Sequence, residues 1–280
     1  MFLKAFISFV VLFIIDYITK DLLIASLGAV AVNIALIIIY DLKNLKEVKI
    51  IKTKFDNKAN LRILKIGFFT FILTFLGTYL INSPRYAIDD LLENNLQTIF
   101  GIIIMPASFM GLLGQYIIQP SLTNLSKCIE EKKYQELRSI IIKLILLVII
   151  AGIFVTIVAY FLEVPVLNLV YGVELKPYFN SMMIIILGSI LYSLSTVLSA
   201  VLIAMRKTLS QTIVYGITSV ISTIMAYTLV KQIEIQGASI TYTATMAIMA
   251  IAFLIYTIFN MMKYKEKWKL NENINNNSNI

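Results

Sequence analysis

"IIIKLILLVIIAGIFVTIVAYFL", residues 140–162, is a long apolar run interrupted by one charged residue, Lys143. About 18 consecutive apolar residues are enough for a helix to cross the hydrocarbon core of a bilayer. The same character extends over the chain, since 59% of the 280 residues are hydrophobic, 14% are charged and the mean hydropathy is +0.85. Strands of a membrane β-barrel would be shorter and would alternate apolar with polar residues. The sequence therefore predicts an all-α integral membrane protein.

Further runs of this kind predict eight transmembrane helices in total. We expect them at residues 2–18, 21–41, 63–82, 96–120, 140–162, 179–205, 209–230 and 237–261. The first run follows Lys4, as the apolar part of a signal peptide would. However, the segment from Asp16 to Asp21 has no small-residue cleavage site, and a second run follows at once. We therefore expect residues 2–18 to be retained as a span.

Lysines and arginines are concentrated on one side of this predicted topology. Of the 24 Lys and Arg residues, only Lys20, Arg85, Lys176 and Lys231 lie in segments on the opposite side. Because Lys and Arg favour cytoplasmic loops, both termini are predicted to be cytoplasmic. The net charge of +8 is then mostly a collar that faces anionic lipid headgroups. We expect membrane lipids, and no nucleic acid, as its partners.

The sequence is poor in the residue types that most catalytic and metal sites need. It has no His and one Cys, Cys128, which excludes an intrachain disulfide and argues against a His/Cys metal site. Catalysis by Ser-His-Asp or Cys-His groups is excluded for the same reason. No nucleotide-binding motif is present. We expect a protein that is not an enzyme, holds no metal and uses no cofactor.

The segments between the spans are short on the external side. The longest are residues 83–95 and 163–178, which leave no room for an extracellular domain. The cytoplasmic segment 121–139 mixes Leu and Ile with charges, so it is either an amphipathic helix at the membrane surface or a helical loop that continues the next span. The tail, "NENINNNSNI", is rich in Asn and is predicted to be disordered.

Small and polar residues recur at a spacing of four in the later spans, as in Ser189/Ser193 and Ser219/Thr223. This spacing places the members of each pair on one helical face. Such a face either packs tightly against a neighbouring helix or lines a hydrophilic cavity. The sequence leaves both interpretations open.

Two further residues, Pro106 and Arg85, have clear chemical consequences for the predicted spans. Pro106 lies within the expected span 96–120 and should kink it, either as a static bend or as a flexing point. Arg85 follows Pro84 at the outer end of the third span. It either snorkels to the surface or holds a phosphate or carboxylate with its planar fork of donors. The nearby acids at 89, 90 and 93 could neutralise it, or two of them could bind a divalent metal.

Four stretches resemble a known family. "SPRYAIDDLL", followed about ten residues later by "FGIIIMPASFMGLLGQYIIQPSL", resembles the start of the C-terminal half of bacterial polysaccharide (O-antigen or capsule repeat-unit) flippases. "LNLVYGVELKPY" resembles an external loop of that family, and "IQGASITYT" resembles the beginning of one of its last spans. These flippases belong to the multidrug/oligosaccharidyl-lipid/polysaccharide exporter superfamily.

The resemblance implies a fold of two six-helix lobes around a cavity. Residues 63–262 would form the C-terminal six-helix lobe, 1–41 the last two helices of the N-terminal lobe, 42–62 a basic cytoplasmic linker and 263–280 a disordered cytoplasmic tail. About four N-terminal spans of the family pattern have no counterpart here. We therefore expect a truncated product or a chain that another subunit completes.

The resemblance also implies a function. Members move undecaprenyl-pyrophosphate-linked oligosaccharide repeat units across the bacterial plasma (inner) membrane for surface polysaccharide and lipopolysaccharide biosynthesis. The expected partners are the lipid-linked oligosaccharide and other polysaccharide-assembly membrane proteins. On this hypothesis Arg85 binds phosphate, Gln115 and the Ser/Thr faces hydrogen-bond sugar, and Pro106 is the conformational hinge.

Three other functions remain open from the sequence. An integral-membrane glycosyltransferase or polymerase would use Asp89 and Asp90 on an external loop. A permease subunit of an ATP-driven exporter would dock its ATPase through residues 121–139. A multidrug exporter of the same superfamily would carry acids buried within its spans, and the expected spans contain almost none.

Overall fold

A computed structural model describes residues 2–38 and 57–277, and every regular element in those ranges is a helix. The chain forms two compact units, Met1–Asn60 and Leu61–Ile280. In the first unit, α1 (Phe2–Thr19) and α2 (Leu22–Leu36) form a helical hairpin. Asp21 caps α2, because its carboxylate accepts the backbone N–H of Leu23 at 2.9 Å. Most of the expected linker 42–62 lies outside the described residues.

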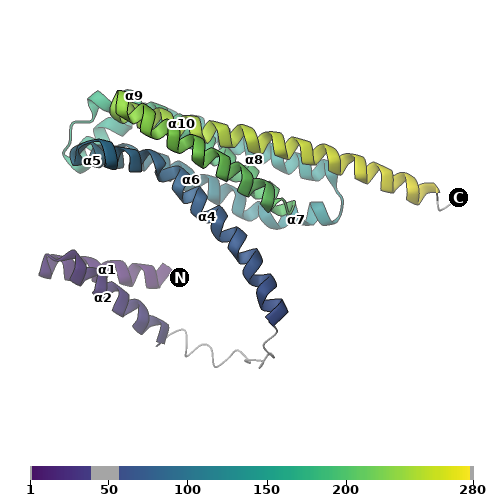
Figure 1. The fold of residues 1–280 in the computed structure, drawn as a ribbon, viewed down its shortest axis with the longest axis horizontal. Coiled ribbons are helices and arrows are strands. Elements are labelled where there is room, and N and C mark those ends of the chain that lie inside the picture. The colour runs from purple at the N-terminus through teal and green to yellow at the C-terminus, as the bar shows by residue number, and fades with distance from the viewer. Residues whose placement is uncertain (1, 39–56, 278–280) are drawn as a thin grey trace. The chain divides into compact units, whose positions relative to one another are not determined.

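The second unit is a bundle built around α9 (Figure 1). Its elements, in chain order, are α4 (Asn57–Leu91), α5 (Asn94–Ile103), α6 (Met105–Ile118), η3 (Gln119–Ser121), α7 (Leu122–Glu130), α8 (Tyr134–Tyr171), η4 (Lys176–Tyr178), α9 (Phe179–Ala204) and α10 (Thr208–Asn277). α9 contacts α6, α7, α8 and α10, so it forms the centre of the bundle.

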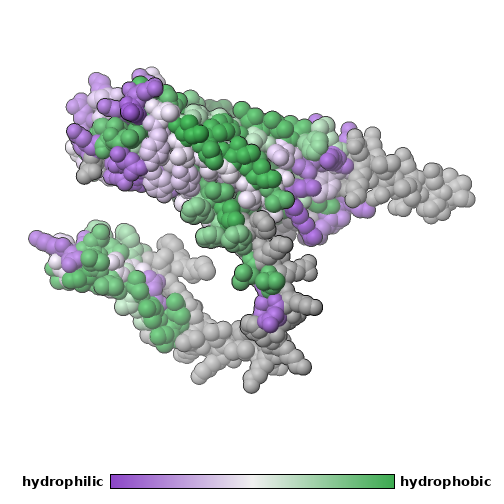
Figure 2. All heavy atoms as spheres, in the orientation of Figure 1, coloured by the Kyte–Doolittle hydropathy of each residue, from purple (hydrophilic) through white to green (hydrophobic). Residues whose placement is uncertain are grey.

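The helices of this bundle and its surface are those expected of a membrane protein. Four helical stretches among the described residues are long and apolar enough to cross a membrane: Asn95–Glu130, Tyr134–Tyr171, Lys176–Ala204 and Thr208–Lys265. Figure 2 shows hydrophobic residues over the middle of the bundle and hydrophilic residues gathered toward its two ends. A helix that exposes apolar side chains to a bilayer satisfies all its backbone groups internally, which is why this composition folds as helices.

The longest element, α10, is a hairpin of two arms. Helical geometry is lost at Ile233 and Glu234, where Glu234 has φ +47°. The arms then pack side by side, with the hydroxyls of Thr245 and Ser222 3.0 Å apart. Gly237 lies so close to the first arm that a Cβ there would collide with the carbonyl oxygen of Leu229. The break falls between the spans expected at 209–230 and 237–261, and the second arm continues past residue 261.

Buried hydroxyl groups connect the helices of the bundle. The Ser193 hydroxyl on α9 donates to the backbone oxygen of Met110 on α6 at 2.8 Å, and Thr243 on α10 donates to that of Ile184 on α9 at 2.6 Å. Small residues permit this approach, since a Cβ on Gly114 would lie 3.0 Å from that of Ser193. The Ser/Thr faces seen in the sequence therefore serve helix packing at these positions.

Two external loops expected from the sequence are largely helical instead. α4 continues through Pro84 to Leu91, and α8 continues through Pro165 to Tyr171. The prediction of turns over 83–95 and 163–178 is wrong for these residues. A Pro removes one helical hydrogen bond, but packing compensates, since Leu80 and Ile88 flank Pro84 and are fully buried.

The segments that the sequence predicts to be cytoplasmic also differ from expectation in detail. Residues 121–139 contain a separate short helix, α7, that ends at Glu130 and is followed by a turn before α8 begins at Tyr134. Leu125 and Cys128 of α7 are buried against the bundle. At the C-terminus, α10 extends as helix to Asn277, into the segment for which the sequence predicts disorder.

Gly188 on α9 offers a test of this packing. Replacement by Ala would place a Cβ 2.8 Å from a ring carbon of Tyr242 and 2.7 Å from the hydroxyl of Thr243. We expect Gly188→Ala to lower the free energy of unfolding by about 1–3 kcal/mol, the usual cost of overpacking. The melting temperature in detergent measures this loss.

The matched control is Gly216→Ala on α10, where a Cβ would meet nothing within 4 Å. Since Ala is the better helix former by about 1 kcal/mol, this variant should be as stable as the wild type or more so. Equal melting temperatures for the two variants would contradict the packing described here.

Candidate functional site

Arg85 lies at a cavity of about 480 Å³ near the α4–α5 end of the bundle. α4 supplies Arg85, and α5 and α6 supply the rest of the wall. The lining residues are Arg85, Gln97, Thr98, Gly101, Ile102, Ile104, Met105 and Ser108. One cation and several neutral polar groups therefore share a cavity between three helices.

A glycine allows the Arg85 side chain to reach this wall. The position that a Cβ would take on Gly101 is 3.2 Å from the Nη2 atom of Arg85. The guanidinium group thus lies against the surface of α5, in space that a larger residue at 101 would occupy. Gln97, Gly101, Ile104 and Ser108 follow at spacings of four, three and four, which is the pattern of one helical face.

The charge of Arg85 is not neutralised by the neighbouring acids. Among the side chains that the structure describes, no carboxylate forms an ion pair with Arg85. Asp90 instead accepts a hydrogen bond from the hydroxyl of Tyr227 on α10. An exposed guanidinium beside neutral donors is suited to bind an oxyanion, because its planar fork can donate two parallel hydrogen bonds.

Gln115 lies apart from this cavity. It is exposed on α6, seven residues beyond Ser108 and on the same face of the helix. At 1.5 Å per residue, the two positions are about 10 Å apart along the axis. The structure therefore does not place Gln115 and Arg85 in one cavity. The structure does place Gln97, Thr98 and Ser108 there. The spacing of Gln97, Gly101, Ile104 and Ser108 is the sequence signal that could have identified two of them.

Pro106 lies directly after an interruption between two helices. α5 ends at Ile103, Ile104 has φ −86° and ψ −11°, and α6 begins at Met105 with Pro106 in its first turn. A Pro is well tolerated there, since its missing N–H would have had no helical partner. The expected kink is thus present. Whether it flexes stays a prediction.

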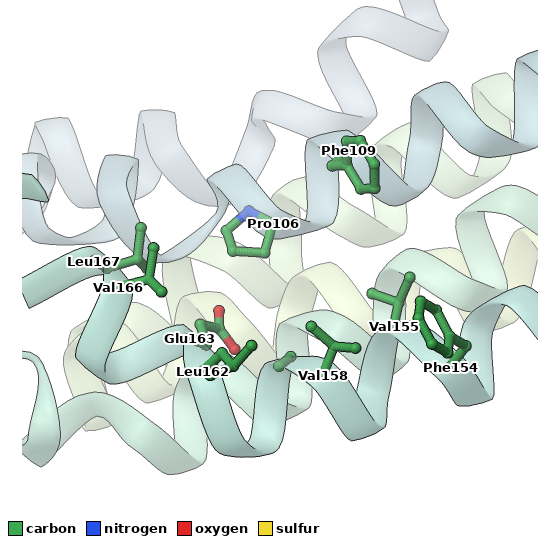
Figure 3. A pocket seen from close by; sticks show the side chains of 10 residues that line it. Pro106, Phe109, Phe154, Val155, Val158, Leu162, Glu163, Val166 and Leu167 are labelled. Carbon is green, nitrogen blue, oxygen red and sulfur yellow. The ribbon is translucent and has the colours of Figure 1, made fainter.

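A second pocket lies on the other side of this interruption, between α6 and α8. It has a volume of about 340 Å³ and is lined by Pro106, Phe109, Phe154, Val155, Val158, Ala159, Leu162, Glu163, Val166 and Leu167. Glu163 is its one charged residue, and Figure 3 shows the carboxylate pointing from α8 toward Pro106. We call this pocket the Glu163 groove.

Glu163 corrects an expectation from the sequence. The expected span ended at residue 162, which placed Glu163 in an external loop and left almost no acid within the spans. In the structure Glu163 is inside α8 and only 6% exposed. The apolar residues Val164, Val166 and Leu167 after it are the signal that the helix continues.

Comparison with protein-family models, curated proteins and solved structures finds no match to this chain. The family resemblance noted in the sequence therefore stays a prediction.

The hydrogen bond between Tyr227 and Asp90 is open to a double-mutant cycle. We expect Tyr227→Phe and Asp90→Ala each to lower the free energy of unfolding by about 1 kcal/mol, the net value of one such bond. The double variant should lose no more than either single variant, because both remove the same interaction. Additive losses in chemical denaturation would show that Asp90 and Tyr227 act separately.

Proposed function

We propose that this chain takes part in moving an undecaprenyl-pyrophosphate-linked oligosaccharide across the bacterial plasma membrane. The observation that carries the proposal is the Arg85 cavity, in which a guanidinium without an ion-pair partner lies beside Gln97, Thr98 and Ser108. Support also comes from the apolar helices of the bundle and from the sequence resemblance to polysaccharide flippases.

The chemistry of the cargo explains why such a cavity is useful. A pyrophosphate cannot enter hydrocarbon unpaired, because burying an isolated ion costs many kcal/mol. Arg85 would offset this cost through charge-assisted hydrogen bonds to the phosphate oxygens. The neutral amide and hydroxyl groups of Gln97 and Ser108 match the hydroxyls of a sugar, and the polyprenyl tail would stay in lipid beside the exposed apolar helices.

The predicted topology gives Arg85 a place in the transport path. It is one of four basic residues on the side opposite the cytoplasmic collar, so it would meet the headgroup near the outer leaflet. Gln115, on the same face of α6, would contact sugar farther along. The helix interruption before Pro106 would let α5 and α6 change their angle as a second lobe moves against this one.

Binding of undecaprenyl pyrophosphate to the purified chain in nanodiscs tests the proposal. Arg85→Ala should weaken binding about 10- to 100-fold, the equivalent of losing roughly 1.5–3 kcal/mol of charged hydrogen bonding. Undecaprenol, which has the same tail without phosphate, should bind weakly and equally to both proteins. Native mass spectrometry or a fluorescent analogue provides the measurement.

Lys231→Ala is the matched control. Lys231 is a basic residue on the same predicted side of the membrane, is exposed, and does not line the cavity. This variant should bind as the wild type does. If Arg85→Ala and Lys231→Ala weaken binding equally, attraction is a general effect of surface charge, and the cavity has no specific role.

A further inference from the structure

Glu163 is an anomaly in the energetics of the bundle. It is 6% exposed, and neither of its carboxylate oxygens has a hydrogen-bond partner among the described residues. An ionised carboxylate in such surroundings costs several kcal/mol unless a positive or hydrogen-donating group compensates it. No Lys or Arg lines the groove. Unless the carboxyl group holds a proton, the compensating group therefore comes from outside the residues that line the groove.

The walls of the groove restrict what that group can be. A metal ion such as Ca²⁺ needs six to eight oxygen ligands, whereas the other lining residues are Pro, Phe, Val, Ala and Leu. A single carboxylate among apolar side chains cannot complete such a shell. The same walls suit an organic cation, because aliphatic groups can contact its apolar part.

Two aromatic rings add to this preference. Phe109 on α6 and Phe154 on α8 both line the groove, from opposite sides of it (Figure 3). The face of an aromatic ring attracts a cation by about 0.5–2 kcal/mol, most strongly where water is excluded. Phe109 is 58% exposed and Phe154 is 66% exposed, so the rings also form an open apolar rim. A ligand that arrives from the bilayer would contact them first.

We propose that the Glu163 groove is a binding site for a hydrophobic organic monocation. Its positive centre contacts the Glu163 carboxylate, and its apolar groups fill the space between α6 and α8. The groove is distinct from the Arg85 cavity, since Met105 and Ser108 of α6 line the cavity whereas Pro106 and Phe109 line the groove. Two sites of opposite charge thus share one short segment of helix.

Equilibrium binding of radiolabelled tetraphenylphosphonium tests this site. The purified chain is placed in phosphatidylcholine nanodiscs, and binding to empty nanodiscs is subtracted. We expect saturable binding that Glu163→Gln weakens about tenfold or more, because the charge is lost while the shape is kept. Glu174→Gln is the control, since Glu174 is exposed beyond the end of α8 and outside the groove.

A second variant keeps the acid and alters the rim. Phe109→Leu should weaken tetraphenylphosphonium binding about threefold or more through loss of the ring face. If Glu163→Gln fails to fold, as judged by circular dichroism and gel filtration, Phe109→Leu alone still tests the site. Absence of saturable binding to the wild type would overturn the proposal. Equal binding by the wild type and folded Glu163→Gln, or by the wild type and Phe109→Leu, would do so as well.

The inference and the proposed function can fail separately. Arg85→Ala should leave tetraphenylphosphonium binding unchanged, and Glu163→Gln should leave undecaprenyl pyrophosphate binding unchanged. If Arg85→Ala abolished cation binding, the two pockets would form one site, and the assignment of a separate cation site would be wrong.

Discussion

The structure depends on one constraint of the bilayer: a polar group inside it must find its partner within the protein. Backbone groups meet this requirement by forming helices, which explains why all described elements are helical. Side-chain hydroxyls meet it by bonding to backbone oxygens, on their own helix or on a neighbour. The Ser193 hydroxyl has an acceptor of each kind within reach, since it lies 3.0 Å from the backbone oxygen of Ser189 on α9 and 2.8 Å from that of Met110 on α6. These bonds hold small residues at the closest helix contacts.

Against this background, Arg85 and Glu163 are two charged groups that line neighbouring pockets of the bundle, and neither forms an ion pair with a described residue. They lie on different sides of the segment from Ile104 to Phe109, where the helix is interrupted. A cation beside polar donors favours an anionic ligand, whereas an acid among apolar walls favours a cationic ligand. A change in helix angle at the interruption at Ile104 would thus alter both pockets.

The sequence predicts much of this fold because apolar length alone decides it. The break in α10 was expected between residues 230 and 237, and the structure has it at Ile233 and Glu234. The ends of α4 and α8 were not predicted, because Pro84 and Pro165 are helix-ending signals that tertiary packing overrides. The spacing of Ser189 and Ser193 identifies a helical face but not what that face contacts. That choice between packing and cavity needed the positions of α6 and α10.

The same limit applies to the pockets. Arg85 stood out because a basic residue on the predicted outer side is rare in this chain. Glu163 did not, since its burial results from the continuation of α8 past residue 162 and from the position of α6. Charge can be read from composition, whereas the absence of a partner is a property of the assembled helices.

The central claim is that the described bundle crosses the membrane with its α4–α5 turn and its α9–α10 turn on opposite sides. Single cysteines at Glu93 and Lys207, two exposed residues in those turns, test it in a Cys128→Ser background. An impermeant maleimide applied to intact cells should label the cysteine at position 93 at once, and the cysteine at position 207 only after the membrane is permeabilised. Labelling of both positions from the outside would contradict the account.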